Sequence, residues 1–205
     1  MQFYPLSERF FSIQGEGLHC GRAAYFIRLF GCNVRCPWCD SKYAWSGEPS
    51  ETLPVSELVA SAAQSGAKMA VITGGEPCMF DLAPLAEGLK SANIAAHLET
   101  SATLPLDESE AAFDWVAASP KLFARTEPSA AARADEIKLI ISEPSDMARY
   151  DEILALAKNA KAVWLHPEWS RAGDRELLDF ICRTVKSRGG IFRAGWQMHK
   201  NYFAR

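Results

Sequence analysis

The chain has 205 residues, 48% hydrophobic and 23% charged, so it can bury a core and is typical of one globular domain spanning residues 1–205. A formal charge of −3 without long blocks of like charge gives no electrostatic basis for binding nucleic acid or anionic lipid. Residues 1–11 lack the segments of a signal peptide, and no stretch approaches the roughly 20 apolar residues that cross a bilayer. We therefore expect a cytoplasmic protein with no membrane partner and no direct nucleic-acid partner.

Hydrophobic periodicity and turn residues predict that strands alternate with helices along the chain. The predicted strands are 23–30, 69–73, 94–99, 115–118, 136–141, 163–166 and 191–193. The predicted helices are 54–66, 82–91, 146–159 and 175–187. The polar segments 41–53 and 125–135 are expected to be loops.

This alternation favours a mainly parallel sheet built from right-handed crossovers. The strands and the fewer clear helices fall short of a complete eight-stranded barrel of about 250 residues. The predicted fold is therefore α/β, a partial, incomplete (β/α) barrel of about six mainly parallel strands. Polar motifs recur where strands end, which places the expected site at the C-terminal strand ends.

The cysteines have an informative distribution. Cys32, Cys36 and Cys39 lie within eight residues, directly after a predicted strand, whereas the other three are scattered. In a cytosolic chain such a group indicates a metal site or catalysis rather than disulfides. Three thiolates on a [4Fe–4S] cluster leave one iron open to a small molecule, so the loop predicts such a cluster. A structural zinc site with a histidine as fourth ligand and a Cys-x-x-Cys redox pair are the alternatives.

A glycine-rich segment, Gly74-Gly75-Glu76-Pro77, follows the second predicted strand. Taken alone it is typical of a turn. It comes one strand–helix–strand interval after the cysteines, and glycines let the backbone approach a ligand amine whose charge Glu76 can offset. The segment therefore predicts a ligand contact.

The cysteine spacing and this glycine-rich segment together resemble the radical S-adenosylmethionine (SAM) superfamily. The segment 11–17, Arg28 and the pair Asp40-Ser41 are similar, within that superfamily, to the 7-carboxy-7-deazaguanine synthase family. Further matching motifs are Glu99-Thr100-Ser101, Ser119-Pro120-Lys121, Glu136-Ile137-Lys138, His166-Pro167 and Gln197-Met198-His199-Lys200. The resemblance covers most of the chain and implies three cofactors, a [4Fe–4S] cluster, SAM and Mg²⁺.

The resemblance implies a carboxypterin substrate contacted by Ile13, Gln14, Gly15, Glu16, Arg28 and Thr73. An amide and a carboxylate can pair with the edge of an aminopyrimidinone ring, and Arg28 offers a fork for the substrate carboxylate. Ser41 stands where the family more often has a threonine that binds Mg²⁺, and serine keeps that oxygen ligand. Without the resemblance, residues 14–17 would be a solvated turn and the Asp40-Ser41 pair would cap one.

For the cofactor, the resemblance implies contacts from Gly74, Gly75, Glu76, Glu99, Ser119, Pro120, Lys121, Lys138 and His166. The chain departs from the family at Ser101-Ala102, where Asn-Gly is common, and at His166, where glutamine is common. These departures bear on the contacts to the ribose and adenine of the cofactor. The alternative interpretation is that Lys121 and Lys138 are surface lysines and that His166 is a satisfied polar group.

The implied reaction is the radical ring contraction of 6-carboxy-5,6,7,8-tetrahydropterin to 7-carboxy-7-deazaguanine, with loss of ammonia, towards queuosine and related 7-deazapurines. The implied partners are a second copy of the chain in a homodimer and an external one-electron donor such as flavodoxin. Two other functions stay open from the sequence. One is an activase of glycyl-radical enzymes, which shares the cluster spacing, and the other is a zinc-stabilised binding module without catalysis.

Overall fold

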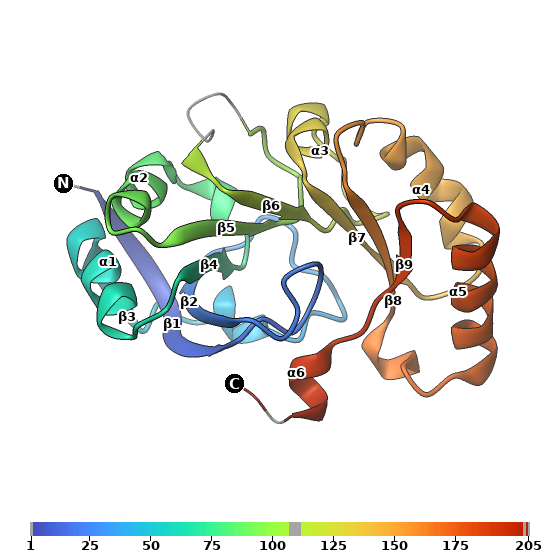
Figure 1. Cartoon of the computed structure of the whole chain (residues 1–205), viewed down its shortest axis with the longest axis horizontal. Helices are drawn as coiled ribbons and strands as arrows, with labels where there is room; N and C mark the ends of the chain where they lie inside the picture. The colour runs from blue at the N-terminus through green and yellow to red at the C-terminus, as the bar shows by residue number, and fades with distance from the viewer. Residues whose placement is uncertain (1, 107–111, 203, 205) are drawn as a thin grey trace.

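The computed structural model describes residues 2–106, 112–202 and 204, and within these residues nine strands form one sheet. The strand order is β3-β1-β2-β4-β5-β6-β7-β8-β9, as Figure 1 shows. The strands are β1 (Phe3–Ile13), β2 (Ala23–Leu29), β3 (Glu51–Pro54), β4 (Met69–Gly74), β5 (Ala95–Thr100), β6 (Trp115–Ala118), β7 (Glu136–Ile141), β8 (Ala162–Pro167) and β9 (Phe192–Ala194).

The helices follow the strands and pack mainly against one face of the sheet (Figure 1). They are α1 (Val55–Gln64), α2 (Ala83–Ser91), α3 (Pro128–Arg133), α4 (Asp146–Leu154), α5 (Arg175–Arg188) and α6 (Met198–Asn201), with short 3₁₀ turns η1 (Lys42–Ala44), η2 (Pro77–Met79) and η4 (Trp169–Arg171). No helix in the described ranges is long and apolar enough to cross a membrane.

The sheet is parallel from β2 through β4 to β9 and has an antiparallel extension at one edge. There β1 pairs antiparallel with both β2 and β3. The edge strands β3 and β9 do not pair with each other, so the sheet stays open. The prediction of an incomplete, mainly parallel (β/α) barrel is confirmed.

Several local predictions need correction. Strand β1 was not predicted, because Pro5 and the polar residues 7–9 interrupt its apolar pattern. The expected loop 41–53 contains η1 and β3, and the expected loop 125–135 contains α3. The helix expected to reach residue 159 ends at Leu154. The sheet also has more than about six strands, since its antiparallel edge carries no clear sequence signal.

The two faces of the sheet differ in the kind of side chain they carry. On β2, Tyr25, Ile27 and Leu29 belong to the main hydrophobic core with the helices, whereas Ala24 and Phe26 belong to a small cluster on the other face. Side chains alternate along a strand, so positions two apart share a face. The face away from the helices is therefore the one available for a site.

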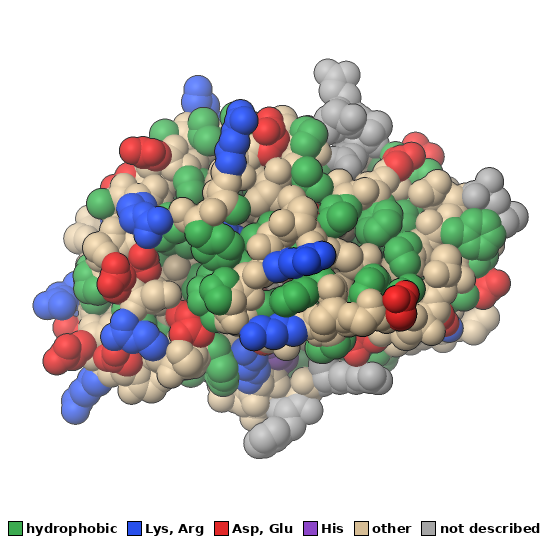
Figure 2. Space-filling model, turned by 180° about the vertical axis from the view of Figure 1, so that it is seen from behind, with side chains coloured by type: hydrophobic (Ala, Val, Ile, Leu, Met, Phe, Trp, Pro, Cys, Tyr) green, Lys and Arg blue, Asp and Glu red, His purple; other side chains and the backbone are tan. Residues whose placement is uncertain are grey.

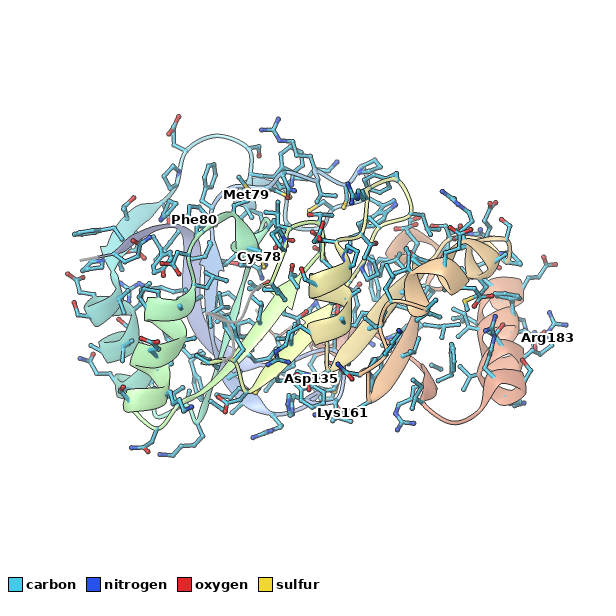
Figure 3. All side chains as sticks on the ribbon, turned by 90° about the horizontal axis from the view of Figure 1, so that it is seen from above. Cys78, Met79, Phe80, Asp135, Lys161 and Arg183 are labelled. Atoms are coloured by element: carbon cyan, nitrogen blue, oxygen red, sulfur yellow. The ribbon has the colours of Figure 1, made fainter. Side chains whose placement is uncertain are left out.

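The two ends of the strands are separated in space. In Figure 3, Cys78, Met79 and Phe80, which follow β4, lie at one end of the strands. Asp135 and Lys161, which precede β7 and β8, lie at the other end. Parallel strands share one direction, so their C-terminal ends gather on the side of Cys78. The predicted cluster cysteines, which follow β2, and the glycine-rich segment, which follows β4, lie there.

Candidate active site

A cavity of about 980 Å³ lies over the face of the sheet away from the helices and reaches the C-terminal ends of the strands. Most of the predicted site residues line it: Ile13, Gln14, Gly15, Glu16, Arg28, Cys32, Cys36, Cys39, Ser41, Thr73, Gly74, Gly75, Glu99, Ser119, Lys121 and Lys138. Glu76, Pro120 and His166 do not line it, and all three are buried. The structure therefore brings the predicted cluster, cofactor and substrate residues into one cavity.

The segment that carries the three cysteines (residues 32–41), which we call the cysteine segment, directs backbone N–H groups at two of the predicted cluster ligands. Val34 and Arg35 each donate from N–H to Cys32 Sγ at 3.4 Å, and Ser41 donates to Cys39 Sγ at the same distance. Arg35 has a φ of 53°, and such left-handed turns bring successive N–H groups to one point. The segment therefore offers hydrogen-bond donors to the sulfur atoms of two cluster ligands.

Cys36 is the most buried of the three cysteines. Burial raises the pKa of its thiol, while the neighbouring Lys121 acts in the opposite direction. In the described part of the chain, no three Cys, His, Asp or Glu side chains stand close enough to hold a single metal ion. The cluster assignment therefore rests on the shared cavity and the N–H donors, and not on a preformed site for one ion.

Ser41 follows the last cluster cysteine and also faces the cavity. Its hydroxyl donates to Asp40 Oδ1 at 3.1 Å, and Asp40 Oδ2 pairs with Lys200 at 3.2 Å. A hydroxyl and a carboxylate are the oxygen donors that Mg²⁺ prefers. The residues fit the metal, and its binding here stays a prediction.

The two glycines after β4 allow close backbone contact. Gly74 has a φ of 143°, and a Cβ there would lie 2.2 Å from the carbonyl oxygen of Leu29. A Cβ on Gly75 would lie 2.0 Å from the carbonyl oxygen of Gly31 and 2.7 Å from Cys32 Cβ. Their lack of side chains lets the end of β4 lie directly against the start of the cysteine segment.

Glu76 has a different position from the one expected. Its carboxylate is fully buried and accepts hydrogen bonds from the Thr100 hydroxyl (2.7 Å), the Ser101 N–H (2.6 Å), the Ser101 hydroxyl and the Cys78 N–H (3.0 Å). Its acceptors are thus used within the protein. Glu76 ties the glycine-rich segment to the end of β5, and it does not present a charge to the cavity.

The turn that follows β1 (residues 14–21), which we call the substrate turn after the contacts predicted for it, is held by its own side chains. Gln14 Oε1 accepts from the N–H groups of Gly15 (2.8 Å) and Glu16 (3.3 Å), and Gln14 Nε2 donates to Glu99 Oε1 at 3.0 Å. Gln14 is only 4% exposed. The amide expected to contact the substrate therefore already has hydrogen-bond partners within the protein.

Lys138, on β7, lies between two carboxylates. Its ammonium pairs with Glu16 Oε2 at 3.0 Å and with Glu99 Oε2. Burial alone would lower the pKa of Lys138, but the two carboxylates raise it above its usual value. Burial alone would raise the pKa of Glu16, but Lys138 and His166 outweigh burial and lower this pKa. For Glu99 the effect of burial is the larger one, and its pKa is raised. One ammonium thus stabilises Glu16 as the anion and only partly compensates Glu99.

Arg28, on β2, has one edge occupied and one edge free. Its Nε donates to Glu8 Oε1 at 2.8 Å, and the same oxygen accepts from the Tyr43 hydroxyl at 2.8 Å. Thr73 is the register partner of Arg28 on β4, so the two side chains share the cavity face. Among the described residues, no hydrogen bond occupies the terminal nitrogens of Arg28. This arrangement suits the binding of an anionic group.

Lys121 and Ser119 form the wall beside the cysteines. Lys121 Nζ donates to both the carbonyl and the hydroxyl oxygen of Ser119 at 2.6 Å and lies 5.6 Å from the centre of the Trp38 ring. Burial lowers the pKa of Lys121. Pro120, which lies between them in the sequence, is buried. A positive charge is thus fixed close to the cluster ligands.

His166 lies at the C-terminal end of β8 and is 2% exposed. Neither ring nitrogen has a hydrogen-bond partner among the described residues. A Cβ on Gly195 would lie 2.5 Å from its Nε2, so the backbone at that glycine covers the ring. Burial lowers its pKa to about 4, despite the nearby Glu16. The ring is neutral near pH 7 and does not reach the cavity directly.

Comparison with known proteins agrees with this site. Residues 26–163 match the Radical SAM superfamily. The chain is 40% identical over 197 residues to a 7-carboxy-7-deazaguanine synthase of Synechocystis sp., covering 96% of this chain and 91% of the relative, and 35% identical to that of Flavobacterium psychrophilum, covering 97% and 91%. The chain belongs to the 7-carboxy-7-deazaguanine synthase family of the radical SAM superfamily.

A solved structure supports the same family. The crystal structure of QueE from Escherichia coli matches with a TM-score of 0.81 and 31% identity, covering 96% of this chain and 95% of that chain. Membership of the superfamily makes the chain a radical SAM enzyme that uses a [4Fe–4S] cluster and SAM, a small-molecule substrate and an external electron donor. The zinc-stabilised binding module is thereby set aside.

The sequence prediction missed some residues at the cavity and gave others no role. Gln197 Nε2 donates to Glu16 Oε1 at 2.7 Å, and Met198 N–H donates to the carbonyl oxygen of Gly15 at 2.9 Å, so α6 packs on the substrate turn. The 197–200 motif was the available signal. No sequence signal pointed to Glu8 and Tyr43, because their contact joins distant segments.

The view from behind (Figure 2) shows hydrophobic side chains gathered in the middle of that face with Lys and Arg among them.

Proposed function

We propose that this member of the family converts 6-carboxy-5,6,7,8-tetrahydropterin to 7-carboxy-7-deazaguanine with loss of ammonia, in 7-deazapurine biosynthesis towards queuosine. The observation that carries the proposal is that one cavity holds the three cysteines, the free edge of Arg28 and the substrate turn. Relatives of that name also match nearly the whole length of the chain.

Cys32, Cys36 and Cys39 would hold the cluster. When bound, the cluster and SAM would supply the radical chemistry that the ring contraction requires. For SAM, we propose contacts from Gly74, Gly75, Glu99, Ser119, Lys121 and Lys138, all of which line the cavity. Glu76, Pro120 and His166 would act on the cofactor only through the residues that cover them.

The other residues bind and orient the substrate. Arg28 presents its terminal nitrogens to the substrate carboxylate, and Glu8 and Tyr43 fix the plane of the guanidinium. Ser41, with Mg²⁺, would bind a second oxygen of the substrate. Gln14, Gly15 and Glu16 of the substrate turn line the cavity and would pair with the pterin edge. With SAM and the substrate in the cavity, exclusion of water from the reacting carbon would also protect radicals from side reactions.

The same proposal includes the domain organisation, the partners of the protein and its location in the cell. We propose one domain over residues 1–205, a homodimer, an external one-electron donor such as flavodoxin, and a cytoplasmic location. The family resemblance supports the dimer and the donor. No disulfide joins the cysteines in the described residues, which suits the reducing conditions that an iron–sulfur enzyme needs.

The deciding experiment is anaerobic incubation of reconstituted protein with reductant, SAM and the carboxypterin, followed by mass spectrometry. The proposal expects a brown protein and formation of 7-carboxy-7-deazaguanine. If 5′-deoxyadenosine accumulated without a deazaguanine product, the substrate would be another one, as for a glycyl-radical activase. A colourless preparation that held zinc and no iron would contradict the radical chemistry itself.

A further inference from the structure

Glu136, the first residue of β7, is a fully buried carboxylate. Its Oε1 accepts from the indole N–H of Trp115 at 3.0 Å, and its Oε2 accepts from the indole N–H of Trp164 at 2.7 Å and from the backbone N–H of Leu18 at 2.8 Å. The two indoles belong to the neighbouring strands β6 and β8, and Leu18 belongs to the substrate turn. One side chain thus joins three separate parts of the fold.

The substrate turn approaches this carboxylate closely enough to exclude a side chain. Gly17 has a φ of 70°, and a Cβ there would lie 2.3 Å from Glu136 Oε1. The turn is closed on itself by backbone hydrogen bonds from Gln14 N–H to Arg22 and from Gly21 N–H to Gln14, both 2.8 Å. Because the turn is closed, fixing its tip at Glu136 also fixes the residues before it.

Strand β7 therefore holds the substrate turn at two points. Glu136 and Lys138 are two positions apart and share a face of the strand. Lys138 pairs with Glu16, and Glu136 accepts from Leu18, two residues further along the turn. We propose that Glu136 is a positioning residue that fixes the substrate turn against β7, in the position in the cavity that binding of the pterin requires. This inference rests on the proposed function of the site.

The chemistry of the contact calls for a carboxylate. All three partners of Glu136 are N–H donors, and an ionised carboxylate is an acceptor on both oxygens. Glutamine has the same shape but carries an NH₂ group on one side, which would face an N–H donor. In Glu136→Gln the Leu18 N–H therefore meets either that NH₂ group or a neutral oxygen in place of a charged one, so the hydrogen bond to the turn is lost or weakened in both orientations.

The test compares Glu136→Gln with Asp135→Asn in the reconstituted holoenzyme. Asp135 is the neighbouring carboxylate and also accepts hydrogen bonds, from Val116 N–H, Arg133 and Lys161, and none of these donors belongs to the turn. Figure 3 shows it beside Lys161. We expect Glu136→Gln to raise KM for the carboxypterin roughly tenfold to a hundredfold, as for loss of a hydrogen bond to a charged group, with kcat changed far less. Asp135→Asn should leave KM within about twofold.

A second readout does not depend on turnover. Amide hydrogen exchange of residues 14–21 should become faster in Glu136→Gln and stay unchanged in Asp135→Asn. Unchanged exchange and KM in Glu136→Gln would overturn the inference, and so would equal effects of both variants. If wild type failed to convert the carboxypterin, the proposed function would fall, and the exchange experiment would still decide the role of Glu136.

A pair of glycine variants tests the contact from the other side, should Glu136→Gln not fold. Gly17→Ala adds a methyl group that meets Glu136, whereas Gly66→Ala, outside the turn and the cavity, adds one with no other atom within 4 Å. Both positions have positive φ, 70° and 77°, so both variants carry similar backbone strain. The inference expects Gly17→Ala alone to raise KM by the amount given for Glu136→Gln. An equal increase in Gly66→Ala would contradict it.

Discussion

Lys138 Nζ donates a hydrogen bond to Glu16 Oε2 at 3.0 Å and so joins β7 to a turn that lies 122 positions earlier in the chain. The lysine side chain is 7% exposed and that of Glu16 is 20% exposed, so the pair lies largely out of water. Breaking a buried pair by removing one partner leaves a charge without compensation. The contact is therefore expected to matter for both stability and substrate binding.

We expect Lys138→Met to lower the free energy of unfolding by about 3–5 kcal/mol, because Glu16 and Glu99 lose the ammonium they share. Urea denaturation of the protein without cofactors measures this. The control is Lys161→Met, since Lys161 pairs with Asp135 at 2.8 Å but is 62% exposed, and its loss should cost less than about 1 kcal/mol. Equal losses in the two variants would show that Lys138 is an ordinary surface lysine.

For Arg28, we expect Arg28→Ala to raise KM for the carboxypterin roughly tenfold to a hundredfold, because a hydrogen-bonded charge partner of the substrate carboxylate is removed. The iron content and the absorption spectrum of the cluster should not change. Steady-state kinetics and iron analysis of the same preparation measure both. Loss of the cluster in this variant would mean that Arg28 supports the cysteine segment through Glu8 and Tyr43 instead.

The fold was largely predictable from the sequence. Strands such as β6 and β7 have the predicted bounds, because a continuous apolar run between turn residues specifies a buried parallel strand. The helix α5 was predicted from its periodicity and is capped by Asp174, whose carboxylate accepts from the N–H groups of Glu176 and Leu177. The edge strand β1 was not predictable in this way, because pairing with β2 and β3 overrides its mixed composition.

The site was predictable as a set of residues but not as a set of contacts. Motifs identified the residues that line the cavity, because strand ends of a parallel sheet converge. They did not show that Gln14 and Glu76 are occupied by internal partners, since those partners lie far away in sequence. The departure at Ala102 has a backbone consequence that only the structure reveals: its φ is 56°, where a glycine is favoured.

The three cluster cysteines should behave differently from an exposed cysteine elsewhere. Cys32→Ser, Cys36→Ser and Cys39→Ser should each abolish the brown colour and most of the iron after reconstitution, because a thiolate ligand is lost. Cys182→Ser, on the exposed side of α5, is the matched control and should keep full iron and sulfide content. Full iron retention in any of the three cluster variants would remove that cysteine from the ligand set.

Buried His166 predicts a pH dependence of stability. Burial lowers its pKa from 6.5 to about 4, so the unfolded chain binds more protons than the folded protein between these values, and stability must fall as the pH falls. Its share is about 2 kcal/mol between about pH 7 and about pH 5. Buried His97 acts in the same direction and is present in both proteins compared. His166→Gln, the residue common in the family, should therefore reduce the loss of free energy of unfolding over this interval by about that amount, measured by urea denaturation at each pH. An unchanged slope would show that His166 is not buried as a neutral ring.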